Sequence, residues 1–296
     1  MNIIGHHAVR TRLDHILTTG AVAHAYIFVG PAHVGKTTVA HAFASALVMG
    51  RTTCTERITH PDIQIISPEH VTTKHGRVRT KDIGVETARA IAVDAMTTPL
   101  SGVRRVIIVT EAEYLTVAAQ NALLKTLEEP AAQTVLIMTA VHEGRLLPTV
   151  RSRMQRVSLP RVAEAQMATA AAEMFDDAAV RADMLVAAHG CPGIMVRCAA
   201  DDDVRAWYSA MVRDAHALPD MSRAQKIAYA GESAQDVARL QQALIVWMHV
   251  WRAQLYAGDT SRAQMLAAAH AALTALEQTN AQPRLVLEHM LLTLTE

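Results

Sequence analysis

The sequence predicts an α/β layer with a mainly parallel sheet, followed by an all-α region. Three observations predict it. Short β-branched runs alternate with helix-period segments over residues 1 to about 160, a glycine-rich loop joins the first run to a helix, and strand signals stop after Pro160. Such alternation is typical of a parallel sheet covered by helices, because parallel strands need crossover connections.

The first region is expected to contain strands and helices in alternation. A short apolar run between polar or turn-forming residues indicates a strand, and apolar residues spaced three and four apart indicate a helix. The polar stretch Pro68 to Lys81 is expected to form a hairpin or an exposed loop. The expected strands are 25–29, 62–66, 103–109 and 134–139, and the expected helices are 7–18, 36–48, 83–96 and 117–129.

The chain after Pro160 is expected to be helical throughout. Pro219 and Pro283 stand at expected element starts, where proline is tolerated. We place domain boundaries at 1–160, 161–202 and 203–296. The expected helices are 163–175, 177–189 and 193–200 in the second domain, and 204–216, 222–230, 233–257, 260–277 and 283–295 in the third.

Composition and charge restrict the function classes. Lys and Arg together number 28, as do Asp and Glu, so the net charge is zero. Proteins that bind nucleic acid without sequence preference usually carry a basic excess, so any DNA contact is expected to be local or shared with partner chains.

The cysteines and the apolar stretches give no sign of a metal or a membrane. The three cysteines form no C-x-x-C pair, and zinc is not expected. No apolar stretch is long enough to span a membrane and no signal-peptide pattern opens the sequence, so we expect a cytoplasmic location without a membrane partner.

The segment Gly30–Thr38 reads GPAHVGKTT and fits G-x-x-x-x-G-K-[ST], the phosphate-binding loop of nucleoside triphosphatases. A strand precedes it and a helix follows, as the motif requires. Lys36 is expected to reach the outer phosphates and Thr37 to place a hydroxyl on Mg²⁺, so the expected ligand is ATP or ADP with Mg²⁺. The alternative is an ordinary glycine-rich turn. The residues expected to bind nucleotide are Gly30, Pro31, Gly35, Lys36, Thr37 and Thr38.

The apolar strand ending at Val109 is followed by Thr110-Glu111-Ala112-Glu113. In this class of enzyme such a strand normally ends in an Asp that holds metal-bound water, and a neighbouring Glu polarises the attacking water. Thr110 occupies the Asp position and Glu111 keeps the Glu position. Nucleotide binding can survive this change, but hydrolysis is expected to be poor. The alternative is that Glu111 and Glu113 are solvated loop carboxylates.

Two further positions are candidates for contact with phosphate. Thr139 ends the next expected strand and could sense the γ-phosphate, although threonine also favours strand ends through β-propensity alone. Arg151-Ser-Arg153 follows on an expected turn, and Arg153 could act as an arginine finger. The alternative for both arginines is plain surface charge.

The helix VAAQNALLKTLEEP at residues 117–130 closely resembles a signature helix of bacterial clamp-loader subunits, which are AAA+ proteins. The runs HAYIFVGP at 24–31 and LLPTVRSR at 146–153 are similar to the same family, and HGCPG at 189–193 resembles a turn in the small lid domain of one of its subunit types. Gln120 falls among the apolar residues of the signature helix. It is expected to be an amide at the core edge rather than a contact to a neighbouring subunit.

The resemblance implies an AAA+ P-loop module, a small three-helix lid and a C-terminal helical collar. It implies a hetero-oligomeric ring with motor and delta-type subunits, acting on a sliding clamp at primer-template DNA within a replicative polymerase holoenzyme. Arg153 would then reach in trans to ATP held by the next subunit. Ile4, Gly5 and Val9 match a segment that lies near the adenine.

Several departures from the family pattern qualify this expectation. The segment 51–60 is too short for the family's four-cysteine zinc module and keeps only Cys54. The metal-site Asp is replaced by Thr110, and Ile194 or Met195 stands where the lid often carries an ATP-sensing Arg. We therefore expect a subunit that binds nucleotide, hydrolyses it poorly and lends an arginine finger. The alternative is a catalytically active AAA+ ATPase, either a clamp-loader motor subunit or a helicase loader.

Overall fold

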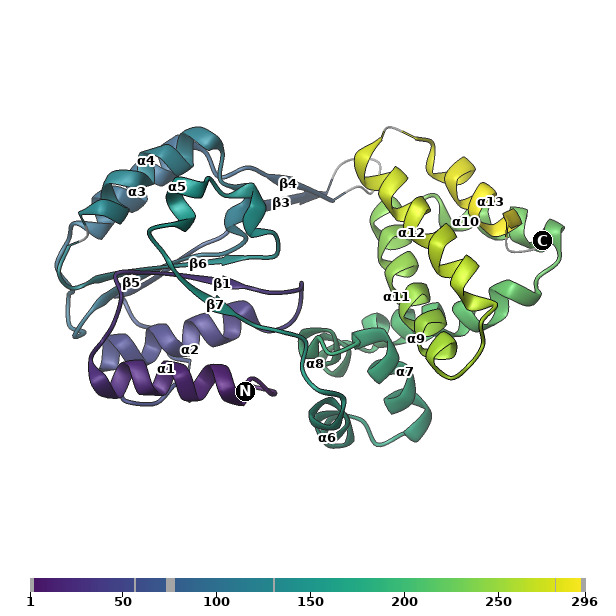
Figure 1. Ribbon diagram of the computed structural model, residues 1–296, viewed down its shortest axis with the longest axis horizontal. Helices are drawn as coiled ribbons and strands as arrows, with labels where there is room; N and C mark the ends of the chain where they lie inside the picture. The colour runs from purple at the N-terminus through teal and green to yellow at the C-terminus, as the bar shows by residue number, and fades with distance from the viewer. Residues whose placement is uncertain (1–2, 56, 73–77, 130, 280, 294–296) are drawn as a thin grey trace. The chain divides into compact units, whose positions relative to one another are not determined.

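The computed structural model describes residues 3–55, 57–72, 78–129, 131–279 and 281–293. The chain forms two compact units (Figure 1). The first contains residues 1–71, 80–167 and 190–192, and the second contains residues 72–79, 168–189 and 193–296. The finer division into three domains stays a prediction.

The first unit is built on a five-stranded sheet in the order β2-β5-β6-β1-β7. All neighbouring strands run parallel, with Phe28 paired to Thr139 on one side and to Val157 on the other. The predicted parallel α/β layer is therefore confirmed, and one edge strand was not predicted. The strands are β1 (Ala25–Val29), β2 (Ile63–Ile66), β5 (Arg105–Val109), β6 (Thr134–Ala140) and β7 (Gln155–Ser158).

Helices cover both faces of this sheet. Figure 1 shows α1 (His7–Thr19) and α2 (Lys36–Met49) along one face, with α3 (Val85–Ala95) and α4 (Val117–Glu128) along the other. Successive strand residues point to opposite faces, so β1, β2, β5 and β6 contribute to both apolar clusters, while β7 contributes Val157 to the cluster under α1 and α2. A short helix, α5 (Pro148–Arg151), adds to the α3–α4 side.

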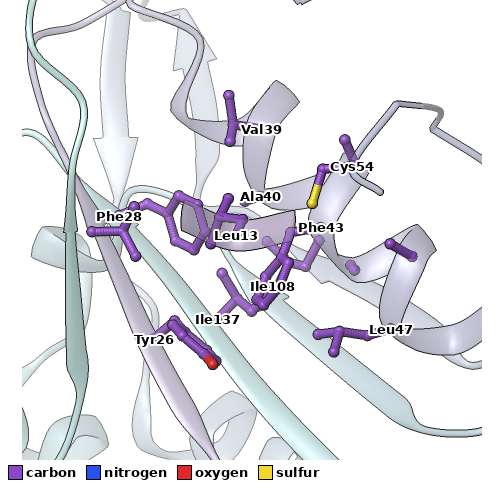
Figure 2. Close-up of a cluster of buried hydrophobic side chains, with 14 of the residues drawn as sticks. Leu13, Tyr26, Phe28, Val39, Ala40, Phe43, Leu47, Cys54, Ile108 and Ile137 are labelled. Carbon is purple, nitrogen blue, oxygen red and sulfur yellow. The ribbon is translucent and has the colours of Figure 1, made fainter. Parts of the chain in front are cut away.

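Aromatic packing dominates the cluster beneath α1 and α2. Figure 2 shows Tyr26 and Phe28 of β1 beside Phe43 of α2. The Tyr26 and Phe43 rings stand nearly perpendicular, at 82°, with centroids 5.1 Å apart. Edge-to-face pairs of this kind contribute about 0.5–1.5 kcal/mol beyond the burial of their apolar area. Leu13 of α1 completes the contact, so the helix before the phosphate loop is fixed to the sheet.

The three cysteines are free and buried. Cys54 lies in the cluster of Figure 2, and its backbone N–H donates to Asp14 Oδ1 at 2.7 Å. Burial raises the thiol pKa of Cys54 and of Cys191, and it raises the pKa of Cys198 to about 11. The segment around Cys54, which is too short for the family's zinc module, is thus anchored by core packing.

The stretch predicted as a hairpin or exposed loop contains a two-stranded sheet of β3 (Glu69–Thr72) and β4 (Val78–Lys81). Residues 73–77 between these strands lie outside the described residues. The sheet edge carries an exposed ion pair between Lys81 Nζ and Glu69 Oε2 at 3.0 Å.

The described residues after Pro160 form helices and no strand, which confirms the predicted all-α region. Its long central helix buries Trp247 and Trp251, and Trp251 Nε1 donates to Ala215 O at 2.8 Å. None of the described helices is both long and apolar enough to cross a lipid bilayer. The helices after the sheet are α6 (Glu164–Met174), α7 (Ala178–Ala188), α8 (Pro192–Ala200), α9 (Asp202–Ala217), α10 (Arg223–Ser233), α11 (Val237–Tyr256), α12 (Arg262–Gln278) and α13 (Pro283–Thr293).

Candidate nucleotide-binding site

The loop of the phosphate-binding motif lies between β1 and α2, at the carboxyl end of a buried inner strand. A Cβ atom on Gly30 would lie 2.2 Å from the carbonyl oxygen of Leu159, so the backbone approaches too closely for any side chain. Gly35, the N-cap of α2, has a φ of 103°, a conformation that glycine adopts without strain. Both glycines of the motif are therefore required by the loop geometry.

Lys36 points back into the loop. Its Nζ donates to the carbonyl oxygens of Gly30 at 2.9 Å and Pro31 at 2.7 Å, and the residue is only 8% exposed. Burial lowers the pKa of Lys36, while the negative charge of Glu113 is the strongest influence that opposes this shift. A cationic side chain held inside a glycine-rich loop suits an anionic ligand such as a phosphate.

Other motif residues surround this lysine. Thr37 is exposed and Thr38 half-buried in the first turn of α2. Pro31 is half-buried at the start of the loop, and His33 near its middle is exposed with a φ of 58°. The hydroxyl of Thr37 is therefore accessible to a metal ion beside the loop.

The segment containing Ile4 and Val9 reaches the loop through a residue that sequence reasoning missed. His6 Nε2 hydrogen-bonds the carbonyl oxygen of Val34 at 2.9 Å, and both residues are buried. Ile4 and Val9 are half-buried, and Val9 packs against the core under α1 and α2. A histidine between a glycine and a second histidine gave no signal for this contact, because only the fold brings it to the loop.

The turn at Gly190 also lies in the first unit. Gly190 O accepts from Val162 N at 2.8 Å, and a Cβ atom on Gly190 would lie 2.8 Å from Arg161 Cβ. Cys191 Sγ accepts from Arg161 Nη1 at 3.5 Å. Burial raises the thiol pKa of Cys191, and the positive charges of Arg161 and Lys36 oppose this shift. The turn predicted at residues 189–193 therefore places Cys191 within electrostatic range of Lys36.

Thr110 is buried at the end of β5, in the position where an acid was expected. Its hydroxyl donates to Ser67 Oγ at 2.8 Å and contacts the carbonyl oxygen of Ile66 at 3.3 Å. The side chain thus joins the carboxyl ends of β5 and β2. It carries no charge toward the loop.

The two acids after Thr110 differ in their surroundings. Glu111 has a φ of 49°, and its carboxylate lies 3.5 Å from His70 Nε2, where both side chains are over 40% exposed. Glu113 Oε1 instead accepts from the backbone N–H of Val141 at 3.0 Å. Sequence reasoning named Glu111 as the candidate acid, but the acid with the stronger influence on Lys36 is Glu113.

Thr139 is 1% exposed near the end of β6. Its hydroxyl oxygen accepts from the backbone N–H of Glu111 at 3.2 Å. This bond holds the backbone of Glu111, whose left-handed conformation turns the chain after β5. The predicted role of Thr139 in sensing phosphate stays a prediction.

Arg153 follows α5 and is held by the signature helix. Its Nη2 lies 2.6 Å from Glu128 Oε1, and its Nη1 donates to the carbonyl oxygen of Thr149 at 2.9 Å. Gln120 supports the same segment, since its Oε1 accepts from Leu147 N at 2.7 Å. Gln120 is buried, in agreement with the prediction of a core-edge amide.

A separate cavity of about 360 Å³ lies among α9, α10 and α11 in the second unit. Trp207, Asp214 and Tyr229 contribute to its lining, and the Tyr229 hydroxyl donates to Asp214 Oδ2 at 2.6 Å. The predicted site residues lie elsewhere, in the first unit. Ile194 and Met195, where an ATP-sensing arginine was considered, are buried residues of α8 in the second unit.

The combination of a parallel sheet, a phosphate loop and an arginine segment held by the signature helix can be compared with known proteins. A sequence profile described as "DNA polymerase III, delta subunit" matches residues 5–163. The chain belongs to this DNA polymerase III delta subunit family. The match covers the whole loop and the Arg153 segment, and it confirms the predicted resemblance to clamp-loader subunits of the delta-prime type.

Relatives of two subunit types are similar to this chain. The DNA polymerase III subunit delta′ of Pseudomonas aeruginosa is 34% identical over 150 residues, which are 47% of this chain and 43% of that protein. The subunit gamma/tau of Mycobacterium bovis is 32% identical over 161 residues, 51% of this chain and 27% of that protein. The similarity thus spans less than half the length of these relatives.

A solved structure supports the fold. The gamma subunit-related protein of Thermotoga maritima aligns with 96% of this chain and 98% of its own, with a TM-score of 0.55 and 15% identity. The predicted architecture, a parallel α/β module followed by helices, is confirmed at the level of fold.

Proposed function

We propose that this chain is a clamp-loader subunit that binds nucleotide, hydrolyses it poorly and helps the ATP-dependent loading of a sliding clamp on primed DNA. Family membership supports the loader assignment. One observation carries the finer proposal: the loop holds Lys36 within it, while Thr110 stands in place of an acid at the end of β5. A cytoplasmic location belongs to the same proposal.

The ligand would be ATP or ADP with Mg²⁺, held by the loop Gly30–Thr38. The loop N–H groups and the start of α2 would bind the phosphates, and the Lys36 ammonium would exchange its carbonyl partners for phosphate oxygens. Thr37 would place its hydroxyl on Mg²⁺, while Ile4 and Val9 would border the base. The bound nucleotide supplies the phosphoryl group, but Thr110 cannot supply the charge that efficient hydrolysis needs.

Equilibrium binding and steady-state hydrolysis on the purified chain test this proposal. Calorimetry with ATP and Mg²⁺ should show binding, and hydrolysis should be near background. Lys36→Ala should abolish binding, whereas Lys125→Ala, which removes an exposed lysine of α4, should leave it unchanged. Rapid ATP turnover by the chain alone would contradict the proposal.

The second part of the proposal concerns partners. Arg153 would act in trans on ATP held by a motor subunit, in a hetero-oligomeric ring that also contains a delta-type subunit and acts on primer-template DNA. A reconstituted loader carrying Arg153→Ala should lose clamp loading. Arg156→Ala is the matched control, because Arg156 is a nearby exposed arginine paired with Glu143. Full loading by the Arg153→Ala complex would exclude this role.

An alternative is a catalytically active AAA+ ATPase, either a motor subunit or a helicase loader. The intact loop lysine and the similarity to a gamma/tau subunit favour it. It predicts turnover by the isolated chain that Lys36→Ala abolishes and that Thr110→Asp raises little. The hydrolysis measurement described above separates the two proposals.

A further inference from the structure

We propose that Glu113 is the metal-facing acid of the nucleotide site, and that its Oε2 accepts hydrogen bonds from the water shell of the Mg²⁺ that accompanies the nucleotide. The inference rests on the proposed nucleotide binding and deepens it. It resolves a chemical problem of the site, because Mg²⁺ prefers anionic oxygen in its surroundings and Thr110 offers none.

The position of Glu113 is fixed relative to the phosphate loop. Glu113 lies in η1 (Ala112–Tyr114), directly after the turn that follows β5. Its Oε1 accepts from Val141 N at 3.0 Å, and the preceding residue, Ala140, accepts from Gly30 N at 3.3 Å. The carboxylate is therefore held at the end of β6, one residue from the backbone bond where the phosphate loop begins.

The second oxygen of this carboxylate is buried. Among the residues that the structure describes, Glu113 Oε2 has no hydrogen-bond partner. A buried acceptor without a donor costs about 1–3 kcal/mol, and more when it is charged. Water molecules bound to Mg²⁺ are strong donors to carboxylates, so a hydrated cation that gains access to this oxygen when the nucleotide binds would satisfy it.

The contacts of the two acids distinguish Glu113 from Glu111. Glu113 Oε1 binds Val141 N, next to the residue whose carbonyl oxygen accepts from Gly30 N at the start of the loop. The Glu111 carboxylate faces His70 on β3 instead. Of the two acids, Glu113 also has the stronger influence on the pKa of Lys36.

A purely structural role makes a different prediction. If Glu113 only caps the end of β6 through Val141 N, an amide oxygen at the same place would serve equally well. Glu113→Gln keeps this acceptor and removes the charge. Glu111→Gln is the matched control, since it removes the neighbouring charge two residues away.

The experiment is calorimetric titration of ATP into the purified full chain, with Mg²⁺ or with excess EDTA. The wild type should bind ATP more tightly with Mg²⁺. Glu113→Gln should lose about tenfold in the Mg²⁺ condition, as expected for one charge-assisted hydrogen bond. In EDTA its affinity should equal or exceed that of the wild type, because a charge that repels phosphate is gone. Glu111→Gln should retain the Mg²⁺ preference, and thermal unfolding without nucleotide should be similar for all three proteins.

Three results would overturn the assignment: Glu113→Gln keeps the full Mg²⁺ preference, Glu111→Gln loses it instead, or Mg²⁺ does not change wild-type affinity. A different result would refute the proposed function itself. In that case the wild type would bind no ATP in either condition, and the inference would fall with it.

Discussion

Arg153 is held in a defined orientation by Glu128, with 2.6 Å between Nη2 and Oε1. Glu128 ends α4, and Gln120 of the same helix binds the backbone of Leu147 before α5. The signature helix therefore supports the arginine segment at two points. A fixed guanidinium loses less conformational freedom on contact with phosphate than a mobile one.

Glu128→Gln should therefore affect function more than stability. The pair is partly exposed, at 35% and 48%, and exposed pairs contribute about 0–1 kcal/mol, so the free energy of unfolding should change by less than that. If Arg153 acts in trans as proposed, the ATP hydrolysis of the neighbouring subunit in a reconstituted loader should fall, because the arginine loses its orientation. Urea unfolding and steady-state hydrolysis check the two parts. Unchanged hydrolysis would show that the pair does not orient Arg153.

Gly30→Ala should destabilise the protein by about 2–3 kcal/mol, since the new Cβ atom would overlap the backbone oxygen of Leu159. Gly231→Ala is the opposing control. Gly231 lies within α10 with open space around its Cβ position, so alanine should stabilise that helix by about 0.5–1 kcal/mol. Chemical denaturation of both variants should give shifts of opposite sign. A neutral Gly30→Ala would mean that the loop can move away from Leu159.

Asp62 should contribute stability that is lost in acid. Burial alone would raise its pKa, but backbone N–H donors from residues 100–102 and the nearby His60 outweigh burial and hold the pKa below its usual value. Because the pKa is lower in the folded state, Asp62 stabilises the fold at pH values above its unfolded-state pKa of about 4. This stabilisation disappears as the pH falls through the folded-state pKa.

Asp62→Asn should thus reduce the free energy of unfolding by about 2–3 kcal/mol at neutral pH and flatten its decline below about pH 4. Asp82→Asn, at an exposed position, should change little. Urea titrations at several pH values provide the measurement. Parallel pH profiles for wild type and Asp62→Asn would contradict the assignment.

His33→Gly should raise stability slightly. His33 has a φ of 58°, which costs a non-glycine residue roughly 1 kcal/mol, and the greater unfolded-state freedom of glycine offsets part of the gain. His142→Gly is the control, because His142 has an ordinary φ of −120° and glycine there should only destabilise. Thermal unfolding of the two variants should move in opposite directions. A loss of stability in His33→Gly would show that the imidazole contributes more than the strain costs.

The sequence was sufficient to predict most of the fold, because the spacing of apolar residues and the positions of turn-forming residues indicate the same element boundaries. The strands β1, β2, β5 and β6 consist mostly of apolar residues, and the helices after Pro160 begin and end within a few residues of their predicted bounds. The edge strand β7 escaped prediction for a physical reason. Of its residues Gln155–Ser158 only Val157 is buried, so no apolar run marks it.

The candidate site was only partly predictable. The motif fixed Gly30, Gly35 and Lys36, since these residue types are required by loop geometry and charge. His6 and Cys191 could not be found, because only the fold brings His6 into contact with the loop and Cys191 within electrostatic range of Lys36. Glu113 was visible in the sequence, but its buried oxygen depends on the turn at Glu111 and is not encoded in any local pattern.

The burial of every cysteine has a practical consequence for spectroscopy. Cys54, Cys191 and Cys198 are at most 4% exposed and their thiols resist ionisation, so maleimide dyes should react with them slowly in the native protein. A single cysteine introduced at an exposed position such as Lys125 would then accept a fluorophore selectively. Single-molecule distance measurements on the labelled protein could proceed without first removing the native thiols.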